Sequence, residues 1–423
     1  MKPRKLHIIY YALKFRWSRT FHSSRPSILM RTRWRWNLKK SPFYSSLIAK
    51  GLGFPVICKS IFMANFDTIN TQGITKKEAF GVAIQAEMSR NFNSTINTIS
   101  IGLSSGTSGN KGIFLTSRTE QEKWVGAVLD RVIGLSLQKR KVAFFLRANN
   151  NLYEAVESKQ IQFEFYDIQQ PLQKIISKFT TSNSDILVAQ PSVLLEIARH
   201  CEQKNLPLNL VKVISVAEVL EEDIKTYLTR IFNLPIHQVY QCTEGFLAYT
   251  CKQGSLHLNE DFLDIKRNYL NKEKTKFTPV ITDYLRYTQP VIRYELNDIL
   301  HLGEKCSCGS KATVIVKIEG RADDVFRFHK AGKEIVIFPD FVRRAIIAAD
   351  ENITNYIVAQ KSNTELLLSV EGEHPTQIKK ATDALIELCT QKKISDIQII
   401  HIPFEHNPIL KFKRIRNDSK TTN

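Results

Sequence analysis

The stretch 104-SSGTSGNKG-112 combines three glycines, four hydroxyl side chains and one lysine, in a chain of 423 residues that has only 17 glycines. Glycine backbones adopt φ > 0 readily and let N–H groups approach an anion, while hydroxyl groups and a lysine add donors and positive charge. The apolar runs 97-NTISIGL-103 and 112-GIFLTS-117 flank the stretch and have the composition of strands. A turn held between two strands favours a phosphate-binding loop over a flexible Ser/Gly linker.

The loop is not a Walker P-loop, because Lys111 precedes Gly112 and a strand, whereas the Walker lysine opens a helix. The order S-S-G-T-S-G-x-x-G instead resembles the phosphate loop of the adenylate-forming enzymes, the superfamily that includes the acyl-CoA ligases. This resemblance implies that the loop binds the phosphates of ATP. The residues concerned are Ser104, Ser105, Gly106, Thr107, Ser108, Gly109 and Lys111.

The overall composition is that of an ordinary globular protein, with 43% hydrophobic and 24% charged residues. The chain is long enough for two or more domains, and no apolar run approaches the roughly 18 residues that span a bilayer. Seven cysteines, an odd number, occur without a recognisable signal peptide. These features predict a reducing, cytoplasmic location and argue against a secreted disulfide framework.

Positive charge is concentrated at the N-terminus. Residues 1–66 hold fourteen Lys and Arg residues and no acidic residue, so the rest of the chain carries only +5 of the net +19. Such a segment is consistent with an organellar transit peptide, or with binding to anionic lipid or nucleic acid. The large apolar residues of 6–17 and 31–48 favour a folded helical layer with a basic outer face. No nucleic-acid-binding module is recognised, and we do not expect the protein to bind nucleic acid. Peripheral contact with an anionic membrane stays open as an alternative.

After the loop, helical and strand patterns alternate. Residues 118–135, 191–203 and 221–232 have helical spacing, whereas 141–148, 211–220 and 236–245 read as strands, which predicts an α/β domain with largely parallel strands. Residues 246–320 are β-rich, and the pattern beyond 323 predicts a small α+β domain. We therefore expect a basic helical segment (1–66), a large α/β domain (67–322) with a β-rich subdomain (246–320), and a mobile C-terminal domain (323–423).

Further segments extend the resemblance to the adenylate-forming enzymes. In 240-YQCTEG-245, Tyr240 takes the place of the residue that packs on adenine and Glu244 that of the Mg²⁺ ligand, while Gln241 replaces a usual glycine and Thr243 completes the T-E pair. Asp298 in 292-IRYELND-298 is similar to the aspartate that binds the ribose hydroxyls. With the loop, these segments imply the adenylate-forming fold and an ATP–Mg²⁺ site in which Glu244 holds the metal and Thr107 is the candidate for a second ligand.

The C-terminal part of the resemblance concerns 319-EGRADD-324 and 409-ILKFKRIR-416. Arg321 would reach the ribose or the α-phosphate, and Asp323 would be the hinge about which the C-terminal domain rotates. Lys411 takes the place of the catalytic lysine, although Leu410 replaces the usual preceding glycine and Lys413 is the alternative.

Each segment by itself also has a purely structural interpretation, as a core tyrosine, a turn aspartate or a solvated C-terminal lysine. Their joint order argues against these interpretations. Thr107, Glu244, Asp298, Arg321 and Lys411 follow one another at intervals of 137, 54, 23 and 90 residues, in the order of the superfamily.

Other segments narrow the resemblance to the phenylacetate–CoA ligase and CoF synthetase branch, most closely to the CoF synthetase-related adenylate-forming proteins. They include 188-VAQPSVL-194, 215-SVAEVL-220 and 282-TDYLRYTQPVIRYELNDIL-300, and the similarity extends from about residue 40 to 416. Glu218 of the second segment is expected to contribute to the nucleotide site.

Two pairs of soft ligands form a second candidate site. Cys251 and His257, and Cys306 and Cys308, together suit a tetrahedral, structural Zn²⁺ site, which the resemblance to phenylacetate–CoA ligase-like proteins supports. The alternative is a set of reduced cysteines at turns beside a surface histidine. Cys58, Cys201, Cys242 and Cys389 are expected to be small buried residues.

The resemblance implies an ATP-dependent ligase. A carboxylate, aryl or related, would attack the α-phosphorus of ATP to give an acyl-AMP and pyrophosphate, and the acyl group would pass to CoA or to a carrier-protein thiol. Two alternatives stay open: transfer of AMP to a hydroxyl acceptor, as in CoF synthetase, and a nucleotide-binding scaffold without turnover.

Overall fold

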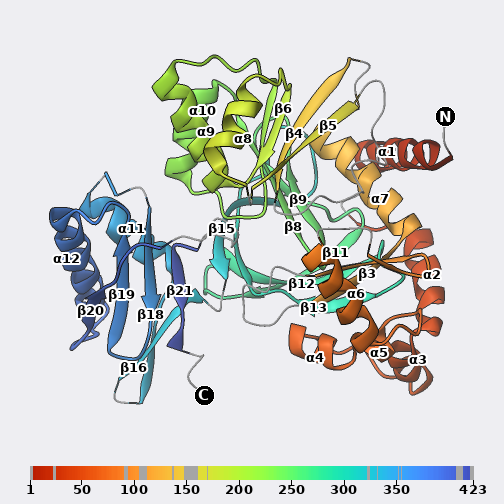
Figure 1. Cartoon of the computed structure of the whole chain (residues 1–423). Coiled ribbons are helices and arrows are strands. Elements are labelled where there is room, and N and C mark those ends of the chain that lie inside the picture. The colour runs from red at the N-terminus through yellow and green to blue at the C-terminus, as the bar shows by residue number, and fades with distance from the viewer. Residues whose placement is uncertain are drawn as a thin grey trace. The chain divides into compact units, whose positions relative to one another are not determined.

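The computed structural model describes residues 3–21, 25–89, 94–103, 112–135, 138–146, 161–168, 170–321, 324–330, 332–350, 352–353, 355–405 and 413–419. The chain divides into two compact units (Figure 1). Unit 1 comprises Met1–Leu296 and Leu300–Lys317, and unit 2 comprises Asn297–Ile299 and Ile318–Asn423.

Unit 1 begins with a series of helices. Side-chain caps define two of their starts: Ser27 accepts from the backbone N–H of Met30, and Ser41 from that of Tyr44. The helices are α1 (Pro3–Phe21), α2 (Ile28–Asn37), η1 (Leu38–Lys40), α3 (Pro42–Ala49), α4 (Lys59–Ala64), α5 (Phe66–Ile69) and α6 (Lys76–Ser89).

A small antiparallel sheet follows, with strand order β1-β2-β3. Its strands are β1 (Thr95–Ile96), β2 (Ile99–Leu103) and β3 (Ile113–Ser117), so the two strands predicted on either side of the glycine-rich stretch are confirmed. Residues 104–111 themselves lie outside the described part of the chain. Helix α7 (Arg118–Val128) starts directly after β3 with a capping box formed by Ser117 and Glu120, and it continues into the π-helix η2 (Leu129–Ile133).

The α/β part of unit 1 has the predicted parallel sheet, with neighbouring strands in the order β5-β4-β6-β7-β8. Its central strand β6 is buried on both faces, as a continuous apolar run requires. The elements are β4 (Arg140–Leu146), β5 (Ile161–Asp167), α8 (Leu172–Thr180), β6 (Ile186–Ala189), α9 (Pro191–Lys204), β7 (Lys212–Ser215), α10 (Glu222–Phe232) and β8 (Ile236–Cys242). Helices α8, α9 and α10 share one hydrophobic core with this sheet.

The sheet continues beyond β8 with antiparallel pairs, in the order β8-β9-β10-β15-β14-β12-β11, and β13 pairs with β12. The β-rich character predicted for 246–320 is thus present. The strands are β9 (Gly245–Thr250), β10 (Leu256–Leu258), β11 (Leu263–Tyr269), β12 (Lys276–Asp283), β13 (Val291–Glu295), β14 (Asp298–Leu302) and β15 (Val314–Arg321).

Unit 2 is an α+β unit with a hairpin and a four-stranded sheet of order β20-β19-β18-β21. It contains both helices and strands, as the α+β pattern beyond 323 predicts. The elements are β16 (Phe326–Lys330), β17 (Lys333–Ile337), α11 (Pro339–Ala349), β18 (Tyr356–Gln360), β19 (Glu365–Val370), α12 (Pro375–Gln391), β20 (Gln398–His401) and β21 (Ile415–Asn417).

Two details differ from the expectations. The strand predicted for 211–220 ends at Ser215, because the backbone turns at Ala217, which has a φ of 70°. Cys201 and Cys389 are buried, but Cys58 and Cys242 are only partly buried. No helix among the described residues is both long and apolar enough to cross a membrane.

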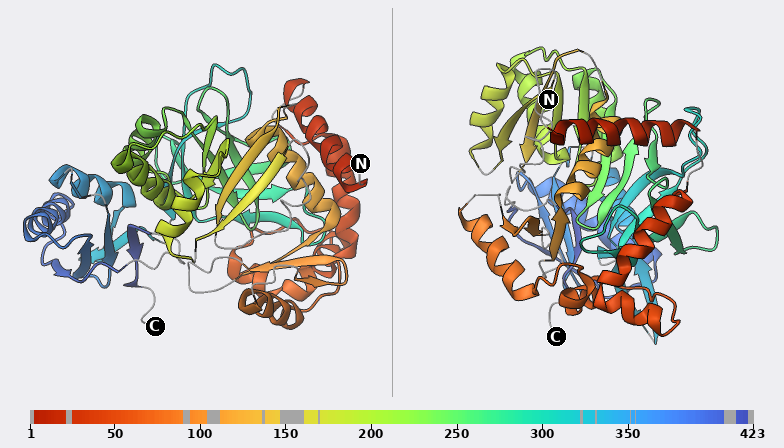
Figure 2. Two further views of the ribbon diagram at one scale, coloured as in Figure 1. Left: turned by 45° about the horizontal axis from the view of Figure 1, so that its top comes forward. Right: turned by 90° about the vertical axis from the view of Figure 1, so that its right-hand side faces the viewer.

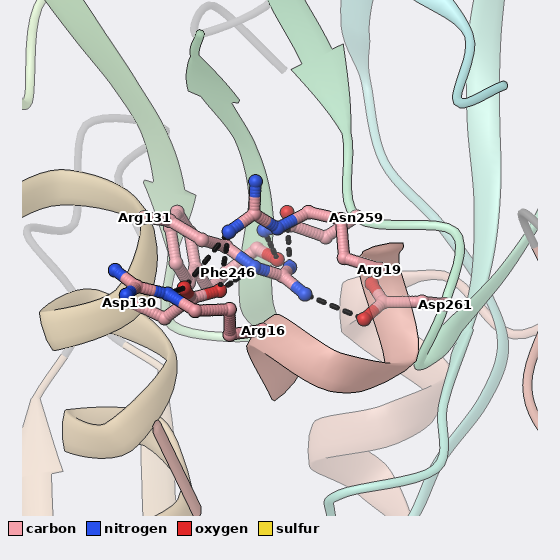
Figure 3. Close-up of polar contacts among 7 residues, drawn as sticks. All are labelled: Arg16, Arg19, Asp130, Arg131, Phe246, Asn259 and Asp261. Atoms are coloured by element: carbon pink, nitrogen blue, oxygen red, sulfur yellow. Dashed lines mark hydrogen bonds and ion pairs between the residues drawn. The ribbon is translucent and has the colours of Figure 1, made fainter. Parts of the chain in front are cut away.

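A buried ionic network attaches α1 to the rest of unit 1 (Figure 3). The carboxylate of Asp130 in η2 has no exposed surface and accepts hydrogen bonds from Arg19 at 2.8 and 2.9 Å and from Arg16 at 3.2 Å, both on α1. The next residue, Arg131, donates to the side chains of Asn259 and Asp261. The carboxylate of Asp130 is therefore both buried and paired with arginines at the place where α1 packs on η2 and on the segment after β10.

Candidate active site

The turn between β8 and β9 carries a carboxylate held by two hydroxyl groups. The Thr243 hydroxyl donates to Glu244 Oε2 at 2.8 Å, and the Tyr294 hydroxyl, from β13, donates to Glu244 Oε1 at 2.9 Å. Burial, together with the neighbouring Glu244 charge, raises the pKa of Tyr294. Tyr294 therefore stays protonated and acts as a donor, which leaves the other lone pairs of Glu244 available for a cation.

This carboxylate lines an open pocket within unit 1. Gly112, the last residue of the glycine-rich stretch, lies in the same wall as the start of β3, so the stretch ends at the pocket. The lining residues are Lys59, Phe62, Met63, Gly112, Ile113, Phe114, Thr243, Glu244, Arg286, Gln289, Val291 and Tyr294.

The segment between β12 and β13 connects two walls of the pocket. Arg286 donates to the backbone oxygen of Leu115 at 3.2 Å and to that of Thr243 at 3.5 Å. Gln289 accepts from the backbone N–H of Leu115 at 3.0 Å. Because Leu115 lies in the strand that follows the glycine-rich stretch, these two side chains fix that strand against the Glu244 turn.

Glu120, the capping-box residue of α7, holds this segment in place. Its Oε1 accepts from the backbone N–H groups of Tyr287 at 2.6 Å and Thr288 at 2.9 Å, and its Oε2 accepts from Ser117. Glu120 is only 5% exposed, so its charge is compensated almost entirely by these donors. The helix start after β3 thereby orients the pocket wall that contains Arg286 and Gln289.

Asp283, at the end of β12, should make the free energy of unfolding of the protein depend on pH. Burial raises the pKa of this fully buried carboxyl group from 3.8 to about 7. Between these two values, the folded protein holds a proton that the unfolded chain has released, so rising pH favours unfolding by up to about 1.4 kcal/mol per pH unit. We expect Asp283→Asn to lack this contribution, which urea denaturation of both proteins from pH 4 to 8 measures.

In that comparison, the difference in unfolding free energy, variant minus wild type, should increase with pH through the window and level off above it. A difference that stays constant with pH would show that Asp283 ionises with an ordinary pKa. The hydrogen bond from the Leu285 N–H to Asp283 Oδ1 can be retained by the asparagine oxygen.

The other described residues that the sequence predicts for the nucleotide site lie in several different elements of the chain. Tyr240 and Gln241 lie in β8, where Tyr240 is buried. The Glu218 carboxylate accepts from the backbone N–H of Ser192 at 3.3 Å, near the start of α9. Asp298 starts β14 and is grouped with unit 2. Arg321 ends β15 in the same unit, and its side chain is not described.

The remaining predicted residues lie outside the described part of the chain. They are Ser104, Ser105, Gly106, Thr107, Ser108, Gly109, Lys111, Asp323 and Lys411. The alternative lysine, Lys413, is described: its amine pairs with Asp324 at 2.9 Å within unit 2.

Four side chains around the pocket were not predicted from the sequence: Glu120, Arg286, Gln289 and Tyr294. Tyr294 stands in the quoted segment 292-IRYELND-298, where only the aspartate was assigned a role. Glu120 carried a local signal, since Ser117 followed three residues later by Glu is a capping box. Its second function, holding a segment 167 residues away, depends on the tertiary fold.

The four candidate zinc ligands, by contrast, come together. The donor atoms of Cys251, His257, Cys306 and Cys308 all lie within 4.8 Å of one another. The Cys251 and Cys306 sulfurs are 3.7 Å apart, close to the edge of about 3.8 Å expected for a zinc tetrahedron with Zn–S bonds of about 2.3 Å. Strand pairing positions the set, because His257 in β10 lies opposite Tyr249 of β9 and Val314 of β15.

Histidine orientation also fits a metal site. His257 is fully buried; its Nδ1 lies 3.2 Å from the carbonyl oxygen of Ala312, and its Nε2 lies 3.4 Å from Cys308 Sγ. A histidine whose Nδ1–H donates to a carbonyl presents its other nitrogen to a metal. Hydrogen bonds, first that from Ser255, lower the pKa of Cys306, which favours the thiolate form that binds metal, whereas burial raises the pKa of the neighbouring Cys251.

No protein-family model matches this sequence, and no curated protein matches it significantly. Solved structures do match. A 2-hydroxyisobutyryl-CoA ligase in the postadenylation state, in complex with R3-HIB-AMP, is 13% identical with a TM-score of 0.66, over 93% of this chain and 88% of that one. The chain has the fold of the adenylate-forming enzymes.

Two further matches agree with this fold. A fatty acyl-adenylate ligase, from structural and functional studies of the E. coli and L. pneumophila enzymes, is 12% identical. Its TM-score is 0.54, over 74% of this chain and 68% of that one. The amide bond synthetase McbA from Marinactinospora thermotolerans is 9% identical, with a TM-score of 0.53 over 77% and 68%. These structural matches establish the architecture of the chain. They do not show whether the chain belongs to the CoF synthetase branch.

Proposed function

We propose that this protein is an ATP-dependent, adenylate-forming ligase that converts a carboxylic acid into an acyl-AMP and transfers the acyl group to a thiol. One observation carries the proposal: within an adenylate-forming fold, the Thr243–Glu244 turn lines the same pocket as Gly112, the end of the glycine-rich stretch. A metal ligand and a phosphate loop must meet in this way to hold ATP–Mg²⁺.

The main obstacle in the reaction is repulsion between an anionic carboxylate and a polyanionic phosphate chain. Glu244, oriented by Tyr294 and Thr243, would hold Mg²⁺, a hard cation that prefers carboxylate oxygens. When bound, the ion neutralises phosphate charge. The backbone amides and hydroxyls of 104–111 would bind the terminal phosphates, and Arg286 and Gln289 would keep the adjoining strand in position.

The residues of the C-terminal part complete the proposal. Asp298 and Arg321 would bind the ribose and the α-phosphate, and Lys411 would bridge the carboxylate and the α-phosphate. The pairing of Lys413 with Asp324 supports Lys411 for this role, because Lys413 already serves as an ion-pair partner within unit 2. Rotation of the C-terminal domain about Asp323 would then move Lys411 away from the reacting groups and admit the acceptor.

For the acceptor we propose CoA, since a solved neighbour of TM-score 0.52 contains both an acyl-adenylate and CoA. An aryl or related acid is the proposed substrate class, on the resemblance to the phenylacetate–CoA ligase branch. The experiment is acid-dependent exchange of labelled pyrophosphate into ATP, screened over aryl and aliphatic acids. Exchange supports the proposal, whereas ATP binding without exchange for any acid indicates a scaffold, and AMP transfer to a phenol indicates the hydroxyl alternative.

We further propose that Cys251, His257, Cys306 and Cys308 bind one structural Zn²⁺. The expected result is one zinc per purified chain by atomic absorption, and Cys306→Ser should lose it. Since the four ligands join β10 to the loops after β9 and β14, loss of metal should lower the melting temperature by about 5–10 °C. Cys58→Ser, a thiol outside the cluster, is the matched control; equal metal content in both variants would contradict the site.

A further inference from the structure

Helix α1 has two apolar faces. On the inner face, Ile8, Ala12 and Phe15 are buried, and the first two pack with Val125 and Leu129 of the α7–η2 helix. This packing satisfies the hydrophobic side that an amphipathic surface helix needs. The opposite side of such a helix is ordinarily polar.

The outer face of α1 is instead apolar and exposed. Leu6, Tyr10, Leu13 and Trp17 follow one another at intervals of four, three and four residues, so they form one stripe along the helix. Their exposed fractions are 53%, 57%, 53% and 58%, respectively, and Ile9 beside them is 38% exposed. A continuous exposed stripe of this kind marks an interaction surface more often than scattered apolar residues do.

Helix α2 adds to this surface. Ile28, Leu29 and Trp36 are 81%, 75% and 68% exposed, and the amine of Lys39 lies 4.8 Å from the centre of the Trp36 ring. Helices α1 and α2 lie on the same side of unit 1, which faces the viewer in the right-hand view of Figure 2. We call their exposed side chains the N-terminal face.

The N-terminal face is also strongly basic. No acidic residue occurs before Asp67, so no negative side chain from this part of the chain offsets its charge. Exposed cations of the face are Lys14, Arg31, Arg33 and Arg35, and Lys39 and Lys40 of the adjoining η1 are exposed as well. Helices that lie in the interface of a membrane have this composition, with Trp, Tyr and Leu surrounded by Lys and Arg.

We propose that the N-terminal face binds the surface of an anionic lipid bilayer. The apolar stripe of α1 enters the boundary between headgroups and acyl chains, and the surrounding lysines and arginines bind anionic headgroups. Each such cation near the surface strengthens binding about fivefold. The ion pairs of Asp130 with Arg16 and Arg19 hold α1 against unit 1, so the stripe is presented as a preformed surface (Figure 3).

Other occupants fit the face less well. A second copy of the chain docked face to face would bring two acid-free basic surfaces together, and like charges across an interface oppose association. A nucleic acid would match the charge but would leave Leu6 and Leu13 without an apolar partner. An anionic bilayer satisfies both the charge and the apolar stripe.

Vesicle flotation of the full chain tests this proposal. Vesicles of equal parts phosphatidylcholine and phosphatidylglycerol should bind the protein, and vesicles of phosphatidylcholine alone should bind it much more weakly, with binding to the former declining as salt is raised. Leu13→Gln with Trp17→Gln should weaken binding at least about tenfold, because both side chains lose apolar burial. Both positions are exposed, so unchanged melting temperatures are expected for the variant.

The matched control is Leu206→Gln with Val211→Gln, which removes two apolar side chains exposed by 37% and 48% in the segment between α9 and β7. The control should bind vesicles as the wild type does. Equal loss in both variants, or no loss in either, would overturn the proposal. So would binding to duplex DNA without vesicle binding, or self-association that depends on Leu13 and Trp17 without vesicle binding.

Discussion

Replacing Glu244 by Gln is expected to lower the rate of acid-dependent pyrophosphate exchange by about 100- to 1,000-fold. The amide keeps the shape of the side chain: its oxygen can accept from one of the two hydroxyl groups of Tyr294 and Thr243, and its NH2 can donate to the oxygen of the other, so the local fold should persist. It lacks the charge that a hard divalent cation requires. The measurement is the initial exchange rate at saturating ATP and acid, over a titration of Mg²⁺.

The Mg²⁺ titration separates loss of the metal ligand from a general loss of activity, because a weakened ligand set should need a higher Mg²⁺ concentration. Glu273→Gln, an exposed carboxylate in the loop between β11 and β12, is the matched control and should exchange at the wild-type rate. If Glu244→Gln exchanged pyrophosphate as fast as the wild type, the assignment of this turn to the metal would fail.

Much of the fold could be predicted because its signals are local. The run 142-VAFFL-146 is apolar throughout, as a strand covered on both faces must be, and it forms most of β4, whose residues 142–145 are buried. Helix α9 starts at Pro191, which has a fixed φ suited to a first turn, and ends at Asn205 in the left-handed conformation. Such signals depend only on neighbouring residues.

Motifs that name residue types predicted which side chains come together, as with Glu244 beside Gly112 at the pocket and the cluster of the four candidate zinc ligands. Arg286 and Gln289 could not be predicted in this way, because their roles are to bond backbone atoms of Leu115, more than 170 positions away. Glu218 is expected at the nucleotide site from its place in a family-like segment; its carboxylate also accepts from the Ser192 N–H at the start of α9, a contact that the sequence does not predict. Contacts of this range depend on the assembled fold.

The ionic network of α1 is a further case, because 118–135 read only as an amphipathic helix and gave no sign that Asp130 would be fully buried. Asp130→Ala is expected to lower the free energy of unfolding of the protein by about 3–5 kcal/mol. The substitution leaves Arg19, and in part Arg16, beside a buried site without their carboxylate. Arg131 keeps its bond to Asp261, so the damage should centre on the attachment of α1.

Urea denaturation gives the size of this effect, and hydrogen exchange along α1 shows where it acts: amides of Ile8 and Ala12 should lose protection in Asp130→Ala. Asp264→Ala, an exposed carboxylate in β11, should change neither. A double-mutant cycle with Arg19→Ala should show a coupling of about 0.5–3 kcal/mol, since the second substitution removes a cation that has already lost its carboxylate partner. Strictly additive losses would mean that the Asp130–Arg19 contact does not hold α1, and the N-terminal face would then owe its position to apolar packing alone.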